Sequence, residues 1–179
     1  MVFVTRLLLV LVATALLGGL FWFGMTSSQG RGLGPTQVGR VMPGFSLPVF
    51  ARYQAEFGET LSLPSGKPVV VSFWASWCGP CHAQAPTLEA TWRRYRDRVL
   101  FIGVNTQDRG NERQAEAFLD QSGISFPNVK DVNNRLGVDY GLFGVPETFF
   151  IRPDGTLQHR HAGPISAAQL RAQLEELLQ

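Results

Sequence analysis

The segment Ser72-Phe73-Trp74-Ala75-Ser76-Trp77-Cys78-Gly79-Pro80-Cys81 contains both cysteines of the 179-residue chain, with two residues between them. A disulfide between them would close so small a ring that it removes only about 2 kcal/mol of chain entropy, against about 4.7 kcal/mol for a 100-residue loop. The pair would therefore be a weak structural cross-link. We interpret Cys78 and Cys81 as a reactive dithiol that forms a reversible disulfide.

The residues on either side predict a strand followed by a helix. Pro68–Trp74 is a run of β-branched and aromatic residues typical of a buried strand. From Cys81 to Tyr95 strong helix formers predominate, and apolar residues recur at helical spacing. Cys78 would then lie at the helix N-terminus, where free N–H groups and the helix dipole favour a thiolate. We predict that Cys78 attacks a substrate disulfide and that the less exposed Cys81 resolves the mixed disulfide.

Other chemistries for these residues stay open at this point. Cys78 to His82 matches C-x-x-C-H, the attachment motif of c-type haem, although here it follows a buried strand and contains a Gly-Pro turn. Metal capture by Cys78, Cys81 and His82 lacks a second Cys or His pair at zinc-site spacing. We interpret His159 and His161, which alternate on one predicted strand, as a solvated edge. We predict no metal site and no cofactor, and we place His82 on the exposed side of the helix.

The N-terminal segment predicts a membrane anchor. Residues 7–25 carry no charge, and as a helix they would span about 28 Å of the roughly 30 Å hydrocarbon core. A cleaved signal peptide is the alternative, although the run is long for one. Residues 26–36 are rich in Gly, Ser, Gln and Pro and indicate a flexible linker. The expected organisation is an anchor or signal over 1–25, a linker over 26–36 and a folded domain over 37–179.

The charge distribution gives no support to nucleic-acid binding. The formal net charge of +2 comes entirely from Arg6 and Arg31, so the expected domain is neutral and lacks a basic surface. Arg6 and the amino terminus precede the apolar run, whereas Arg31 and Arg40 follow it. Charge alone therefore leaves the orientation in a membrane undecided.

The remaining segments complete an α/β pattern. Phe45–Phe50 and Thr60–Leu63 flank a polar loop and could pair as a hairpin. The other expected elements are a strand at Val99–Asn105, a helix at Asn111–Gln121, a short helix at Val132–Tyr140, a strand at Glu147–Arg152, a strand at Leu157–His161 after the turn Pro153-Asp154-Gly155, and a last helix capped by Ser166. We expect a mixed sheet covered by helices on both faces.

Three motifs give the chain a resemblance to the thioredoxin superfamily: Trp77-Cys78-Gly79-Pro80-Cys81, Tyr140–Phe149 and Arg160–Gly163. Within it the chain resembles the membrane-anchored TlpA/ResA-like branch, and most closely the CcmG/DsbE-type thiol-disulfide oxidoreductases of cytochrome c maturation. The specific part is Gly-Val-Pro-Glu-Thr-Phe at 144–149. The resemblance implies a thioredoxin-like mixed sheet flanked by helices, with an N-terminal hairpin and one preceding transmembrane helix. It also implies a central insertion from about Asn105 to Tyr140 that adds a helix and a strand.

The resemblance also implies a substrate groove beside the cysteines. Val145-Pro146 would be a cis peptide facing them, with the Val145 backbone available to an extended substrate. Glu147 would line the groove, and the alternative for this residue is a solvated strand start. Gln84 stands where many relatives carry a glutamate that adjusts proton transfer at the second cysteine. The residues expected to form the groove are Trp77, Gly79, Pro80, Val145, Pro146 and Glu147.

The activity implied by the resemblance is that of a protein-disulfide reductase on the extracytoplasmic side of the cytoplasmic membrane. Its substrate would be apocytochrome c, whose C-x-x-C-H motif must be reduced before haem is attached. Its other partners would be a membrane electron donor of the CcdA or DsbD type and the membrane itself, and the protein would be monomeric. The alternatives are a general TlpA-like reductant, an oxidase of the same fold, and a non-enzymatic metal-delivery module or haem protein.

Overall fold

The computed structural model describes residues 6, 12, 14–19 and 37–179. The chain divides into two units, residues 1–33 and Gly34–Gln179, and the second contains the folded domain. Within the described residues, no helix is both long enough and apolar enough to cross a membrane. Most of the predicted anchor at 7–25 and the whole linker at 26–36 lie outside the described residues, so both stay predictions, as do the proposed boundaries.

A five-stranded mixed sheet forms the centre of the domain, in the order β5-β4-β3-β6-β7. Strands β3, β4 and β5 are parallel, whereas β6 is antiparallel to β3 and β7 antiparallel to β6. All six residues of β3 are buried, as its β-branched and aromatic composition predicts. The strands are β3 Val69–Trp74, β4 Leu100–Asn105, β5 Asn128–Lys130, β6 Glu147–Ile151 and β7 Leu157–Ala162.

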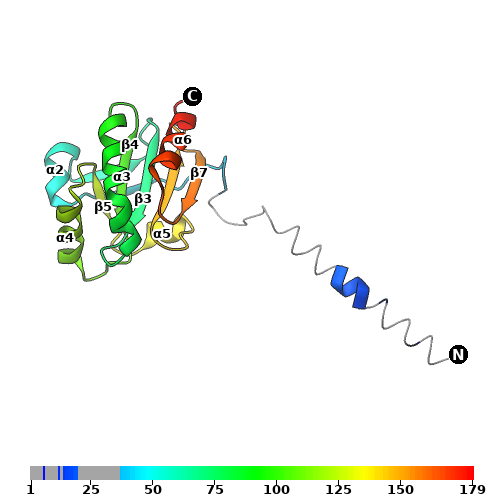
Figure 1. Cartoon of the computed structure of the whole chain (residues 1–179). Helices are drawn as coiled ribbons and strands as arrows, with labels where there is room; N and C mark the ends of the chain where they lie inside the picture. The colour runs from blue at the N-terminus through cyan, green and yellow to red at the C-terminus, as the bar shows by residue number, and fades with distance from the viewer. Residues whose placement is uncertain (1–5, 7–11, 13, 20–36) are drawn as a thin grey trace. The chain divides into compact units, whose positions relative to one another are not determined.

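Helices cover both faces of this sheet, as expected. On one face α3 packs against α4 and α6, and Figure 1 shows α3 crossing the sheet with α6 beside it. On the other face the Phe73 ring contacts Tyr140, which directly follows α5. Ser166 caps α6 through a reciprocal pair of bonds with Gln169, so the predicted cap is confirmed. The helices are α3 Gly79–Tyr95, α4 Glu112–Ser122, α5 Arg135–Asp139 and α6 Ala167–Leu177.

The N-terminal hairpin is present, but the segment between its strands is not a loop. Strands β1 (Phe45–Pro48) and β2 (Thr60–Leu63) pair antiparallel, and helix α2 (Ala51–Phe57) connects them. Its residues are mostly good helix formers, and Tyr53 anchors it by donating its hydroxyl to the Ile124 carbonyl at 2.9 Å. The expectation of a polar loop was therefore wrong, because the helix is fixed by a contact made 71 residues later in the chain.

The segment from Asn105 to Tyr140 holds the extra helix α4 and the short strand β5, as the resemblance implied. In α4 the apolar residues Ala115, Phe118 and Leu119 are buried against the core. Strand β5 forms the sheet edge that receives the N-terminal hairpin, through the backbone bond from Phe50 N–H to the Asn128 carbonyl at 2.9 Å. The insertion therefore widens the sheet on the side that carries helix α4.

Candidate active site

Cys78 and Cys81 are joined by a disulfide at the start of α3. Cys78 is the N-cap residue, and its Sγ accepts a hydrogen bond from the Cys81 N–H at 3.1 Å. Gly79 and Pro80 form the exposed first turn, where a proline is tolerated because the first helical N–H groups have no partner inside the helix. The predicted position of Cys78 at the helix N-terminus is confirmed.

The exposed fractions of the two cysteines hardly differ, at 2% for Cys78 and 1% for Cys81. We expected Cys81 to be the less exposed of the two, and in the disulfide form both cysteines are buried. What distinguishes the two residues is their position. Cys78 terminates the loop, whereas Cys81 lies inside the helix.

The pairing of β3 with β6 places Val145 and Pro146 at the end of the sheet from which the cysteine loop leaves. In the antiparallel β3–β6 pair, Phe73 lies opposite Glu147. Val145 and Pro146 directly precede β6, and the loop that carries the cysteines directly follows β3, so both segments lie at this end of the strand pair. The Val145–Pro146 peptide is cis, as the resemblance implied.

Glu147 is buried and paired. Its side chain is 2% exposed, and both carboxylate oxygens accept from Arg160 Nη2, at 2.9 Å and 2.8 Å. Arg160 Nη2 also donates to the Gly141 carbonyl at 2.8 Å. The alternative of a solvated strand start is therefore wrong. The role of Glu147 in lining a substrate groove stays a prediction.

Arg160 belongs to one of the three family motifs, but sequence reasoning assigned it no role at the site, although a signal was present. His159 and His161 alternate on β7, so Arg160 between them faces the opposite side, where it lies over the rings of Phe143 and Phe149 at 4.5 Å and 5.2 Å. Phe143, two residues before Val145, is 89% exposed. Arg160 thus links the buried Glu147 to an exposed aromatic side chain of the loop that precedes Pro146.

Trp77 is the second exposed aromatic side chain at the site. It is 59% exposed, and its Nε1 donates to the Gln107 carbonyl at 3.3 Å. The neighbouring Ser76 is bound by the buried Asp108, which sequence reasoning also missed. The only signal in the sequence was that Asp108 follows a predicted strand. That position does not reveal its partner Ser76, which lies 32 residues earlier in the chain.

Gln84 has a structural place behind Cys81. It is 3% exposed, accepts from the Ile165 N–H at 3.1 Å and donates to Ser72 Oγ at 3.5 Å. Ser72, Gln84 and Cys81 line the same small cavity of about 10 Å³. Where a carboxylate would be ionisable, this chain has a neutral amide held by its own hydrogen bonds.

His159 and His161 lie on the edge strand β7 and are half-buried. Burial is the main cause that lowers the pKa of His159, the nearby His161 lowers it further, and Glu176 acts in the opposite direction. His82, by contrast, is exposed on α3 as predicted, with its ring edge-on to Phe118 at 4.6 Å. In the part of the chain that the structure describes, no group of three or more His, Cys, Asp or Glu could hold a metal ion.

A cysteine pair at a helix N-terminus and a cis-proline before a central strand are the features to compare with known proteins. Residues 38–160 match the AhpC/TSA family. The chain belongs to this family of thioredoxin-like proteins. It is 31% identical to the thiol:disulfide interchange protein HelX of Rhodobacter capsulatus over 89% of this chain and 88% of that protein.

Two further relatives support the same assignment. The thiol:disulfide interchange protein DsbE of Vibrio cholerae is 31% identical over 93% of this chain and 90% of its own length. The crystal structure of StoA from Bacillus subtilis superposes with a TM-score of 0.64 and 26% identity, covering 75% of this chain and 98% of that one. The chain is therefore a thiol-disulfide oxidoreductase of the ResA, DsbE and CcmG type, with Cys78 and Cys81 as its redox pair.

Proposed function

We propose that this oxidoreductase reduces the disulfide of apocytochrome c on the extracytoplasmic side of the cytoplasmic membrane. The observation that carries the proposal is the Cys78–Cys81 pair at the N-terminus of α3. The Gly144–Phe149 segment accompanies it, and the sequence of this segment resembles the cytochrome c maturation branch. Similarity to proteins named DsbE and HelX, over most of their length, supports it.

The reaction proceeds by two thiol-disulfide exchanges. The Cys78 thiolate attacks one sulfur of the substrate disulfide, forming a mixed disulfide and releasing the other substrate sulfur as a thiolate, which takes up a proton. Cys81 then loses its proton and attacks Cys78 Sγ, so the second substrate sulfur leaves and is protonated in turn. The substrate gains two electrons and two protons, and the domain ends in the disulfide form that the structure shows.

The groove for the substrate would be formed by Trp77, Gly79 and Pro80 on one side and by Val145, Pro146 and Glu147 on the other. The β3–β6 pairing supports this, because Val145 and the loop of the cysteines lie at the same end of the strand pair. The exposed rings of Trp77 and Phe143 offer apolar surface to an unfolded chain that carries the disulfide. The backbone of Val145 would pair with that chain in an extended conformation.

The cellular setting rests on the N-terminal sequence. An uncharged run over 7–25 would hold a monomeric domain at the membrane surface, near a membrane electron donor of the CcdA or DsbD type that reduces Cys78–Cys81 again. A neutral domain gives no reason to expect a nucleic-acid partner.

A general disulfide reductant is the second candidate. The Gly79-Pro80 linker is the one found in ordinary thioredoxins, and one relative, 30% identical over 66% of this chain, is named sporulation thiol-disulfide oxidoreductase A. Such a protein would use the same dithiol on other extracytoplasmic disulfides.

Trapping with Cys81→Ser in the full-length protein, expressed in its native membrane, tests the proposal. Without the resolving thiol the mixed disulfide on Cys78 has no internal route of release, so its lifetime should increase. We expect an apocytochrome c with a C-x-x-C-H motif among the trapped proteins, identified by mass spectrometry. The control is the double variant Cys78→Ser/Cys81→Ser, which should trap nothing. Diverse secreted proteins without a cytochrome would instead support the general reductant.

A further inference from the structure

Ser76, two residues before Cys78, is held from two sides. The Asp108 carboxylate accepts its backbone N–H at 2.6 Å and its hydroxyl at 2.8 Å. On the other side, His82 Nε2 lies 3.0 Å from the Ser76 carbonyl oxygen. Because a carbonyl only accepts, the ring nitrogen is the donor, and it can donate in both the neutral and the charged form of the ring. The backbone and side-chain polar groups of Ser76 are all bound.

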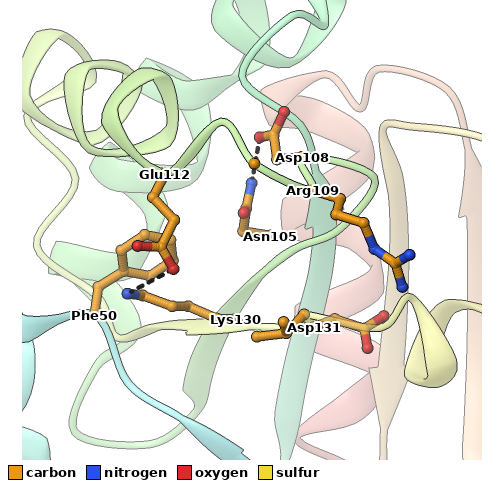
Figure 2. Close-up of a pocket in the computed structure, with 9 residues that line it drawn as sticks. Phe50, Asn105, Asp108, Arg109, Glu112, Lys130 and Asp131 are labelled. Atoms are coloured by element: carbon orange, nitrogen blue, oxygen red, sulfur yellow. Dashed lines mark hydrogen bonds and ion pairs between the residues drawn. The ribbon is translucent and has the colours of Figure 1, made fainter.

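Asp108 is itself anchored to the sheet. It is 6% exposed, and its Oδ2 also accepts from Nδ2 of Asn105, the last residue of β4, at 2.6 Å. Figure 2 shows Asn105 and Asp108 pointing toward each other at the wall of a pocket of about 60 Å³. The carboxylate thus connects the end of a buried strand to the loop that carries the attacking cysteine.

The placement of Ser76 fixes the placement of Cys78. The Cys78 N–H closes a tight turn onto the Ala75 carbonyl at 3.1 Å, with Ser76 inside that turn. At the end of the turn, Cys78 Sγ receives the Cys81 N–H at 3.1 Å. A hydrogen bond to the charged form of a group stabilises that form, so a sulfur kept in this position gives a more stable thiolate.

We propose that Asp108 is a positioning residue for the attacking cysteine. By holding Ser76 against the end of β4, it keeps Cys78 at the N-cap of α3, where the Cys81 N–H and the helix dipole stabilise the thiolate. The inference concerns the dithiol chemistry of the oxidoreductase and is independent of which protein is its substrate.

Positioning and direct charge act on the Cys78 pKa in opposite directions. A nearby carboxylate that acted only through its negative charge would disfavour the thiolate, so its removal would lower the pKa of Cys78. A carboxylate that acts by holding the turn favours the thiolate, so its removal raises that pKa. The sign of the change therefore separates the two roles.

The experiment measures the rate of Cys78 alkylation by iodoacetamide against pH, in the full-length protein carrying Cys81→Ser so that one thiol reacts. Asp108→Ala should raise the Cys78 pKa by about half a unit, which slows alkylation about threefold below the pKa. Asp108→Asn should return the pKa close to the parent value, because its amide oxygen can still accept from Ser76 and Asn105 while its amide nitrogen donates to the Ser76 hydroxyl. An unchanged or lowered pKa in Asp108→Ala overturns the proposal.

Glu89, on helix α3, provides a matched control for Asp108. It is 8% exposed and accepts from the N–H and the hydroxyl of Ser125, at 2.8 Å and 2.7 Å, as Asp108 does from Ser76. It lies about 16 Å along α3 from Cys78. Glu89→Ala should leave the Cys78 pKa unchanged, and an increase equal to that of Asp108→Ala would overturn the proposal. Should Asp108→Ala not fold, Ser76→Ala removes one of the two bonds, and an unchanged pKa in that variant overturns the proposal as well.

Discussion

The two ends of helix α3 are built from different interactions. At the amino-terminal end Cys78 is held through polar contacts, chiefly the bonds of Asp108 to Ser76. At the carboxyl-terminal end Trp92 is 6% exposed and packs its ring against Phe101 and Phe126, at centroid distances of 5.9 Å and 6.3 Å. Polar bonds fix geometry at one end, and apolar burial supplies stability at the other.

Pro86 lies inside the helix, between these two ends. A proline has no N–H to donate, so one backbone hydrogen bond of the helix is missing on the side of the cysteines. The two ends are thus joined by a locally weakened stretch. We therefore expect that the reactivity of Cys78 and the stability of the fold can be changed separately. Trp92→Ala tests this directly, and two further substitutions change stability by smaller amounts.

The largest expected effect is at the carboxyl-terminal end. Trp92→Ala should reduce the free energy of unfolding by about 3–5 kcal/mol, because it removes a buried aromatic ring and leaves a cavity. The pH dependence of Cys78 alkylation in the folded protein should not change. Denaturant unfolding and alkylation kinetics measure the two quantities. A shifted Cys78 pKa would show that the two ends are coupled.

A smaller loss of stability is expected from Arg160→Met, on strand β7. It leaves the Glu147 carboxylate buried without its ion-pair partner, which should cost about 3 kcal/mol of unfolding free energy. Adding Glu147→Gln should restore part of that loss. Arg93→Met, in the last turn of α3, is the control. Arg93 is 68% exposed and Glu89 keeps its Ser125 bonds, so the free energy of unfolding should fall by at most about 0.5 kcal/mol. Equal losses in the two arginine variants would contradict the prediction.

The smallest effect is expected in the linker between the cysteines. Gly79 is exposed at the first position of α3, and a Cβ built there meets no atom within 4 Å. Gly79→Ala should therefore raise the free energy of unfolding of the oxidised protein by about 0.4–1 kcal/mol, by restricting the unfolded chain. Thermal and denaturant unfolding measure it. Destabilisation would mean that the turn needs the conformational freedom of glycine.

Local patterns were enough to predict the elements that carry the chemistry. The apolar run of β3, the helical spacing after Cys81 and the cap at Ser166 each depend on neighbouring residues, and each is found where the sequence placed it. The cis peptide before Pro146 followed from the family motif and not from composition.

The features that sequence reasoning missed depend on contacts between distant residues. Helix α2 is short and polar, and its Tyr53 finds its partner only at Ile124. Strand β5 was implied by the family resemblance but could not be located, because its three residues are too few to show a period. The roles of Arg160 and Asp108 were missed for a related reason. From the sequence alone, a charged residue that is exposed to solvent cannot be distinguished from one that is buried in an ion pair or hydrogen bond. Strand register and the position of loops determine which partner such a residue finds, and both depend on residues far apart in the chain.

The burial of Cys78 determines how a substrate must be shaped. Only 2% of the residue is exposed, yet bond formation requires another sulfur to approach its Sγ directly. An unstructured segment can adapt to the loop and present its sulfur end-on more easily than a disulfide held inside a rigid protein, so the burial of Cys78 favours substrates that are not yet folded.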